Sequence, residues 1–365
     1  MKEGKYLDKV PFNREVEMQV VGEYRSLFPG APGLPRLNTP ISPRENLRRL
    51  FEEKDPLWMP SGRDYFTLIP RIIPDNVARG FVFDVEPLDL RTEAGGKDFF
   101  GVDWVYVEKV GGSMVRPGSP KVPDINRWED YIKFPDLDSL DWEGSAEKHR
   151  EFLNTDRMNL VWVMNGLFER LISFMDFENA ALAMIDEEQQ EGVHRLFDAL
   201  CGFYDKLIEK YRTYYNADII LFHDDWGSQR APFFSLSTVR EMLVPYLSRI
   251  VESCHKRGMY LELHSCGKNE MLAPAMIEAG VDAWTPQPMN DRHMLIEKYG
   301  DKLIIGVQLQ IPMDASEEDT INCVKSFVEE YGKYKNVIAG MLAMGPNQAV
   351  AYKTLYELTR QLYSK

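Results

Sequence analysis

From about residue 156 onwards, two patterns of hydrophobic and polar residues alternate along the chain. Short apolar runs typical of buried strands are each followed by a longer segment whose apolar residues recur at helical spacing. The predicted strands cover 159–164, 218–223, 259–264, 282–285, 302–307 and 337–342. The predicted helices cover 167–174, 178–184, 187–215, 237–257, 269–279, 291–299, 316–331 and 349–363. Strands and helices that alternate with short loops indicate parallel βα units.

The first 150 residues lack this alternation. Residues 60–115 mix proline, glycine and aromatic residues, and only two short strands are predicted there, at 102–106 and 114–115, as a hairpin-like cover. We therefore expect an α/β chain: residues 151–365 form the main part of a TIM (β/α)8 barrel, and residues 1–150 form an irregular extension over the barrel mouth. The aromatic residues expected to be buried under this cover are Trp58, Tyr65, Phe66, Phe81 and Phe83.

Two of the predicted strands end in clusters of polar residues. Residues i and i+2 of a strand point to the same face, so His223 and Asp225 share one face, as do Glu262, His264 and Cys266. An imidazole beside a thiolate suits zinc better than magnesium or calcium. We predict that His264 and Cys266 bind zinc, with His223, Asp225 or Glu262 completing the site. The alternative is a histidine and a cysteine that are simply buried in the core.

Barrel enzymes place their chemistry at the carboxyl ends of the strands, so polar residues there are candidate site residues. Asp225, His223 and Glu262 are the candidate catalytic residues, and of the neighbours Asp224 and Asp225 only Asp225 is expected to face the pocket. Candidates for substrate binding are Asn165, Glu169, Trp226, Gln287, Gln308, Met344 and Asn347 at the strand ends, and Arg71 and Arg79 in the cover. A helix start at Asn165 and Glu169, and core packing of Trp226 and Met344, are the alternatives.

Composition and charge exclude several classes of function. The 365 residues carry a formal net charge of −14 and contain no run rich in lysine or arginine, which argues against binding to nucleic acid or an anionic membrane surface. No apolar run is long enough to span a bilayer, and no dinucleotide, P-loop or serine-hydrolase motif is present. The cysteines Cys201, Cys254 and Cys323 lie in helical patterns and are expected to be small core residues. We expect a cytoplasmic protein with reduced thiols. Whether it forms a homodimer is left open by the sequence.

The strand-end motifs resemble those of the uroporphyrinogen decarboxylase superfamily. The segment from His223 to Gly227 resembles the decarboxylase strand end, and the His-Ser-Cys-Gly run at 264–267 resembles the branch of corrinoid-dependent methyltransferases. The resemblance covers roughly residues 150–360. The decarboxylases' N-terminal arginine motif is not found, although Arg71 and Arg79 lie in a comparable region. The cysteine that zinc methyltransferases carry after the last barrel strand is also absent.

The resemblance implies a TIM-barrel methyltransferase. The expected reaction moves a methyl group from a small methylated donor, such as a methoxylated aromatic, to the cobalt of a corrinoid held by a separate partner protein, with zinc as a Lewis acid. Two alternatives stay open. One is a decarboxylase of a porphyrinogen or a smaller acid, which would need several arginines converging on carboxylates. The other is a binding barrel without catalysis.

Overall fold

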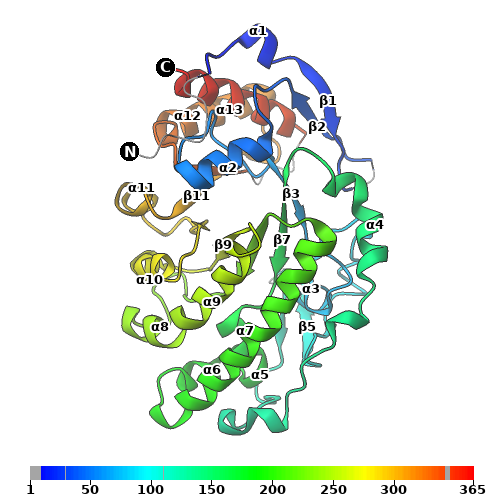
Figure 1. The fold of residues 1–365 in the computed structure, drawn as a ribbon, viewed down its shortest axis with the longest axis vertical. Coiled ribbons are helices and arrows are strands. Elements are labelled where there is room, and N and C mark those ends of the chain that lie inside the picture. The colour runs from blue at the N-terminus through cyan, green and yellow to red at the C-terminus, as the bar shows by residue number, and fades with distance from the viewer. Residues whose placement is uncertain (1–9, 29, 110, 342–345) are drawn as a thin grey trace. The chain divides into compact units, whose positions relative to one another are not determined.

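A computed structural model describes residues 10–28, 30–109, 111–341 and 346–365 (Figure 1). The chain divides into two compact units that are interleaved along the sequence. Unit 1 comprises residues 1–66, 154–158 and 291–365, and unit 2 comprises 67–153 and 159–290. The units therefore do not follow the division at residue 150 that the sequence suggested. The candidate site described below lies wholly in unit 2.

Unit 2 is built on four parallel strands in the spatial order β10-β9-β8-β7. Their bounds are β7 (Met158–Val163), β8 (Ile219–His223), β9 (Tyr260–His264) and β10 (Ala283–Trp284). The helices that follow them are α5 (Leu167–Met175), α6 (Phe177–Ala183), α7 (Glu187–Tyr215), α8 (Leu236–Met242), α9 (Val244–His255), η3 (Glu270–Leu272) and α10 (Ala273–Glu278). The strands are apolar at nearly every position because helices and cover enclose them.

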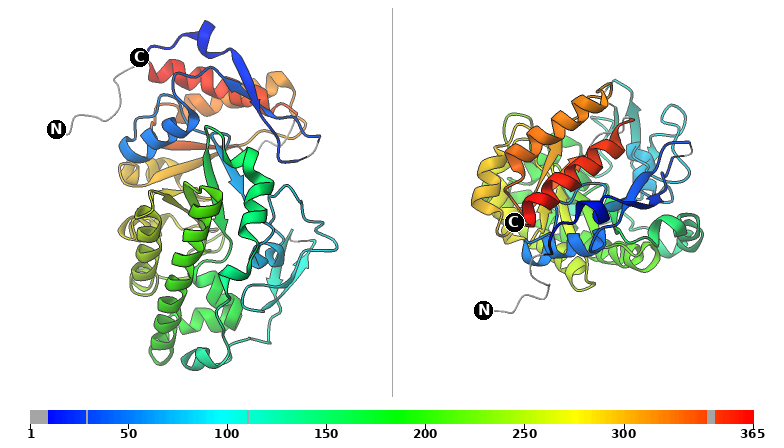
Figure 2. Two further views of the ribbon diagram at one scale, coloured as in Figure 1. Left: turned by 45° about the vertical axis from the view of Figure 1, so that its right-hand side comes forward. Right: turned by 90° about the horizontal axis from the view of Figure 1, so that it is seen from above.

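The amino-terminal part of unit 2 is irregular, as its composition predicts. Its elements are α3 (Pro74–Arg79), β4 (Gly96–Lys97), β5 (Asp103–Val107), β6 (Gly112–Val115), η1 (Ile125–Asp130), η2 (Leu137–Ser139) and α4 (Trp142–Leu153). Strands β4, β5 and β6 form an antiparallel sheet, which confirms the predicted hairpin. Figures 1 and 2 show these strands on the side of the unit away from α8 and α10. The predicted burial is confirmed for Trp58 and Phe66, but Tyr65 and Phe83 are only half-buried and Phe81 is 42% exposed.

Unit 1 contains a further stretch of alternating strands and helices. Its elements are α1 (Arg14–Glu17), β1 (Val20–Tyr24), β2 (Leu34–Leu37), α2 (Pro43–Glu53), α11 (Arg292–Tyr299), β11 (Ile304–Leu309), α12 (Glu317–Tyr331), β12 (Val337–Met341) and α13 (Gln348–Tyr363), and β3 (Tyr65–Leu68) spans the division. Strands β11 and β12 pair in parallel, and Ser61 forms a parallel bridge to Ala339. The parallel βα pattern confirms the predicted α/β fold class of a TIM barrel.

Two local predictions need correction. The single helix predicted over 237–257 is broken at Leu243 into α8 and α9, because Pro245 lacks the N–H that an uninterrupted helix needs and takes the first turn of α9 instead. Cys201 and Cys254 are buried as expected, but Cys323 is only half-buried. None of the described helices is long and apolar enough to cross a bilayer.

Candidate metal centre

The ends of strands β8 and β9 bring two histidines into direct contact. The parallel register pairs His223 with His264, so their side chains leave the sheet at the same level. Their rings stack with centroids 4.8 Å apart and planes 10° apart. Trp162 of β7 also stacks with His264, with centroids 6.2 Å apart and planes 28° apart. The backbone register of β8 and β9 therefore positions these two imidazoles side by side.

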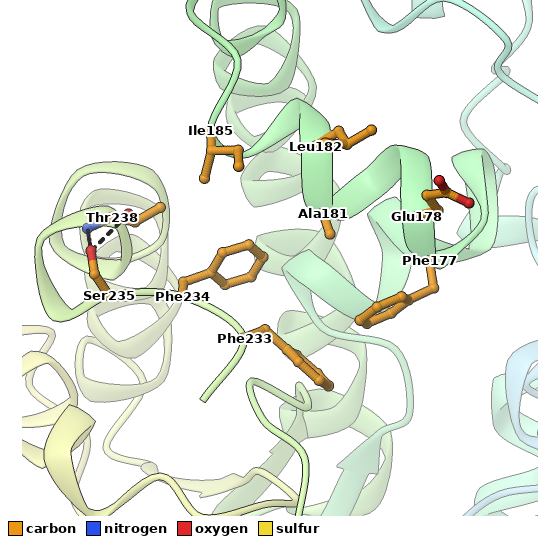
Figure 3. Close-up of a pocket in the computed structure, with 9 residues that line it drawn as sticks. All are labelled: Phe177, Glu178, Ala181, Leu182, Ile185, Phe233, Phe234, Ser235 and Thr238. Carbon is orange, nitrogen blue, oxygen red and sulfur yellow. Dashed lines mark hydrogen bonds between the residues drawn. The ribbon is translucent and has the colours of Figure 1, made fainter. Parts of the chain in front are cut away.

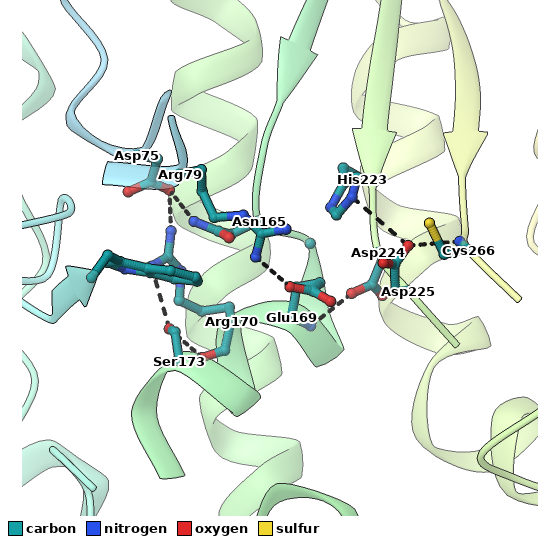
Figure 4. Close-up of polar contacts among 12 residues, drawn as sticks. Asp75, Arg79, Asn165, Glu169, Arg170, Ser173, His223, Asp224, Asp225 and Cys266 are labelled. Carbon is teal, nitrogen blue, oxygen red and sulfur yellow. Dashed lines mark hydrogen bonds and ion pairs between the residues drawn. The ribbon is translucent and has the colours of Figure 1, made fainter. Parts of the chain in front are cut away.

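His223, Asp225 and His264 form a group whose ligand atoms all lie within 4.8 Å of one another, the one such group found among the described residues. His223 Nε2 lies 3.7 Å from Asp225 Oδ1. The Cys266 sulfur lies beside this group, 3.4 Å from His264 Nε2 (Figure 4 shows Cys266 with His223 and Asp225). Two imidazoles and a carboxylate are a donor set found in catalytic zinc sites, and a thiolate is a further zinc ligand.

Burial lowers the pKa of both imidazoles below its ordinary value. Burial, the second imidazole and the Arg79 guanidinium lower the pKa of His264 to about 4. Burial is also the main cause that lowers the pKa of His223. Burial would raise the pKa of Asp225, but the two histidines and the Cys266 N–H outweigh it and lower that pKa. The pKa of the Cys266 thiol is raised to about 12 by burial and by Asp225. Neutral imidazoles and an ionised carboxylate are the forms that bind metals.

The loop that carries Cys266 is fixed by hydrogen bonds and by one glycine. The Cys266 N–H donates to Asp225 Oδ1 over 2.6 Å, and the Gly267 N–H donates to Gln287 Oε1 over 2.8 Å. Gly267 has a φ of +105°, and a Cβ there would lie 2.4 Å from the carbonyl carbon of Gly227. Only glycine fits both the backbone conformation and the close approach of the two loops.

Asp224 points away from Asp225 and organises the start of α5. Its carboxylate accepts hydrogen bonds from the Glu169 N–H over 2.9 Å and from the Trp226 indole N–H over 2.8 Å. It thereby caps a helix whose N-cap residue is Gly166, where a Cβ would lie 2.5 Å from the Asp224 Cβ. The prediction that only Asp225 faces the metal group agrees with this arrangement. Trp226 is fully buried against Asp224, a position that suits packing and leaves no surface for a ligand.

One ion pair joins the cover to the first turn of α5. Arg79 Nη1 donates to Glu169 Oε2 over 2.6 Å, and both side chains are largely buried. The Arg79 guanidinium also lies over the Trp104 ring, 4.9 Å from its centroid. Besides burial, which is the larger cause, the charge of Arg79 lowers the pKa of His223 and His264. Arg79 and Glu169, both predicted as substrate-binding residues, therefore lie together at this edge of the site.

A second buried polar network lies beside this ion pair (Figure 4). Arg170, which has no exposed surface, pairs with Asp75 and donates to Asp98 Oδ2 over 2.7 Å. Asn165 Nδ2 donates to Asp75 over 3.0 Å. The network links α3 and the loop before β5 to α5. Sequence reasoning missed it, because Asp75 and Asp98 are 95 and 72 residues from Arg170. Asn165 is therefore tied to the cover and not to the metal group.

Other predicted site residues lie elsewhere. Glu262 shares the strand face of His264, but it is buried deeper and accepts a hydrogen bond from Thr285 over 2.8 Å, so it is outside the metal group. Arg71 pairs with Glu93 and donates to the Pro87 carbonyl, so its guanidinium is held within the cover. Gln308 and Asn347 belong to unit 1, where Asn347 donates to the Ala315 carbonyl. Met344 lies outside the described residues.

A separate apolar hollow of about 370 Å³ lies between α6 and the start of α8 (Figure 3). Phe177, Leu182 and Ile185 are about half exposed there, at 47%, 50% and 58%. Glu178 is the one titratable residue in its lining. Sequence reasoning did not single it out, since its residues come from two segments about 50 positions apart. The hollow lacks the group of acids, bases or metal ligands that catalysis needs, so the strand-end cluster is the better candidate for the reaction centre.

A parallel α/β fold with convergent histidine, carboxylate and thiol groups at its strand ends is the arrangement of a TIM-barrel enzyme. The family model for uroporphyrinogen decarboxylase (URO-D) matches residues 99–342, and the chain belongs to this family. The match includes both strand-end motifs.

Comparison with solved structures finds one that shares the fold at low sequence identity. A methyltransferase from Methanosarcina mazei superposes with a TM-score of 0.59 at 13% identity, covering 89% of this chain and 100% of that one. A sugar phosphate isomerase/epimerase from Parabacteroides distasonis gives a TM-score of 0.36 at 11% identity, covering 65% and 82%. No curated protein matches by sequence. The chain thus belongs to an enzyme superfamily and shares its fold with a methyltransferase.

Proposed function

We propose that this protein is a zinc-assisted methyltransferase that moves a methyl group from a small methylated donor, such as a methoxylated aromatic, to a corrinoid carried by a partner protein. The observation that carries the proposal is the convergence of His223, Asp225 and His264, with the Cys266 sulfur beside them. Membership of the uroporphyrinogen decarboxylase family supports an enzymatic function. The similarity in fold to a methyltransferase favours the methyltransferase alternative over the decarboxylase alternative.

The residues present fit zinc. The His223 Nδ1 atom is buried and has no hydrogen-bond partner, so this ring offers an uncommitted nitrogen. Ligands at about 2.0 Å (nitrogen) and about 2.3 Å (sulfur) from a tetrahedral zinc lie about 3.5 Å apart. The His264 Nε2 to Cys266 Sγ distance of 3.4 Å matches that separation. His264, Cys266 and one of His223 and Asp225 would hold the ion, which leaves the fourth position of a tetrahedral site for the donor. No cysteine from a later strand is required, because His223 or Asp225 would be the third ligand.

Zinc bound there would act as a Lewis acid on the donor oxygen, which is otherwise a poor leaving group. The chain's own residues would hold and orient the donor. Trp162 offers a flat face beside His264. The Arg79–Glu169 pair closes one edge of the site and provides hydrogen-bonding groups at the rim. The cover that carries Arg79 would keep water from the reacting groups.

A methyl-transfer assay tests the proposal. Purified protein loaded with zinc would be mixed with free cob(I)alamin and a panel of methoxylated benzoates. We expect the cob(I)alamin absorbance to convert to that of methylcobalamin, at a rate proportional to the protein concentration. The His264→Ala variant should lose this activity, while His293→Gln should keep it, because His293 lies on α11 of unit 1 and contacts Glu330.

Two results would contradict the proposal. One is the absence of methyl transfer from every donor in the panel by a protein that holds zinc. The other is carbon dioxide release from a porphyrinogen or a smaller carboxylic acid, which would favour the decarboxylase alternative. The partner protein, the methyl donor and a homodimer stay predictions.

A further inference from the structure

Gln287 makes a pair of hydrogen bonds around Cys266 that none of the predicted roles explains. Its Nε2 donates to the Cys266 sulfur over 3.3 Å, and its Oε1 accepts the Gly267 N–H over 2.8 Å. One side chain therefore binds both the Cys266 sulfur and the backbone N–H of Gly267. Gln287 comes from the loop after β10, whereas Cys266 comes from the loop after β9.

The position of the sulfur depends on contacts from three directions. Asp225 accepts the Cys266 N–H, His264 Nε2 lies 3.4 Å from the sulfur, and Gln287 donates to it. Cys266 lies beyond the end of β9, so no strand pairing fixes its side chain. An N–H that donates to the sulfur limits its rotation.

We infer that Gln287 is a positioning residue that holds the Cys266 sulfur toward His264 in its metal-binding orientation, rather than a residue that binds substrate. The inference rests on the proposed zinc site. It assigns the amide a role on the sulfur: its N–H holds the sulfur by a hydrogen bond, and its carbonyl fixes the loop through Gly267. Partners of this kind typically alter metal affinity by about 10- to 100-fold when removed.

The neighbouring Asn290 offers a matched control. Asn290 Nδ2 donates to the Gly267 carbonyl over 2.9 Å, and its Oδ1 accepts the Glu270 N–H over 2.9 Å. It holds the same loop, but through backbone atoms and without a contact to the sulfur. Asn290 Nδ2 also donates to the Gln287 carbonyl over 3.0 Å, so a variant at Asn290 perturbs the Gly267 loop and the Gln287 backbone but keeps the side-chain donor to the sulfur, which a variant at Gln287 removes.

The experiment uses cobalt(II) as a spectroscopic substitute for zinc in the full-length protein. Wild type, Gln287→Met, Gln287→Glu and Asn290→Ala would be titrated with cobalt(II), and the thiolate-to-cobalt charge-transfer band would be recorded. Zinc affinity would be measured by competition with a chromophoric chelator. Circular dichroism checks that each variant is folded.

We expect Gln287→Met to lose most of the charge-transfer band and to bind zinc about 10- to 100-fold more weakly. Gln287→Glu keeps the acceptor for Gly267 but brings a carboxylate to the sulfur, so it should weaken zinc binding at least as much. Asn290→Ala should keep the band and bind zinc within about threefold of wild type, a change well below that range.

An unchanged band and unchanged zinc affinity in Gln287→Met would overturn the inference, and a raised KM alone would assign the residue to the substrate instead. Equal losses in Gln287→Met and Asn290→Ala would also overturn it, because they would show a loop effect. If wild type binds neither metal, the proposed zinc site itself fails, and that outcome is distinct from a failure confined to Gln287.

Discussion

Two buried polar groups lie close together in unit 2, and they differ in how their charges are matched. In the Arg170 network, both terminal nitrogens of the guanidinium meet carboxylates, and Asp98 also accepts backbone N–H groups from Phe100 and Val102. In the histidine cluster, the donor atoms converge on one another, and His223 Nδ1 has no partner. The charges of the first arrangement are matched by its own residues, although Arg170 Nε and Asn165 Oδ1 have no hydrogen-bond partner, whereas the ligand atoms of the second converge on one another. Pairing of this kind separates structural from functional polar groups in a protein interior.

We expect the largest loss of stability when the Arg170 network is broken. Arg170→Ala leaves Asp75 and Asp98 buried without their cation, so we expect a loss of about 3–5 kcal/mol in the free energy of unfolding. Urea denaturation followed by circular dichroism measures it. The control is Arg240→Ala, which breaks an exposed pair with Glu278 and should leave the unfolding midpoint unchanged. Equal midpoints for Arg170→Ala and wild type would show that the network does not support the fold.

A smaller loss of stability is expected at the loop that holds Cys266. Gly267→Ala places a Cβ at a positive φ, which costs about 1–2 kcal/mol, and brings it against the backbone of Gly227. The loop must shift, so zinc affinity should fall together with stability. Gly258→Ala is the matched control, because Gly258 has a φ of +69° but a Cβ added there would meet no atom within 4 Å. If both variants lose the same stability and both keep zinc, the close approach to Gly227 is unimportant.

A substitution in the histidine cluster should have the opposite effect from one in the Arg170 network: it should weaken zinc binding and change the stability of the metal-free protein little. Cys266→Ser changes one atom in a half-buried side chain, so the metal-free protein should unfold within about 1 kcal/mol of wild type. Its zinc affinity should fall by about tenfold or more, since a hydroxyl is a poorer zinc ligand than a thiolate. Cys323→Ser should change neither property. A Cys266→Ser protein that is strongly destabilised without metal would show that the sulfur is mainly a packing group.

The smallest effect concerns an ion pair at the protein surface. A hydrogen bond to Asp282 raises the pKa of His255 above its ordinary value near 6.5. The charged histidine therefore stabilises the fold below about pH 6.5, and this contribution disappears as the pH rises through the raised pKa. The stability difference between wild type and His255→Gln should be below about 1 kcal/mol at about pH 5.5 and absent at about pH 9. A difference that grows with pH would contradict the assigned pairing.

The predictable part of the fold is the part set by local sequence. The spacing and number of apolar residues located most strands and helices. The alternation of side chains along a strand placed His223 on the same face as Asp225 and His264 on the same face as Cys266, and it relates residues only two positions apart. The break at Leu243 was missed because the apolar pattern continues through it, although Pro245 gave a signal.

Contacts between distant segments were not predictable in this way. Arg79 meets Glu169 across 90 positions, and Gln287 reaches Cys266 across 21. No periodicity in one sequence specifies such pairs, because they depend on how loops from different strands approach each other. The same limit explains why Glu262 was predicted as a candidate ligand. Residue spacing correctly placed Glu262 on the strand face of His264, but it could not show that Glu262 lies deeper, below the end of the strand.

X-ray absorption at the zinc edge tests the central claim most directly, because it reports the atoms around the metal. For zinc-loaded wild type, we predict a nitrogen and oxygen shell at about 2.0 Å and one sulfur at about 2.3 Å. The sulfur shell should vanish in Cys266→Ser, and His264→Ala should hold no stoichiometric zinc. Zinc surrounded by oxygen alone, or a wild type that takes up no zinc, would contradict the assignment of the His223, Asp225 and His264 cluster as a metal centre.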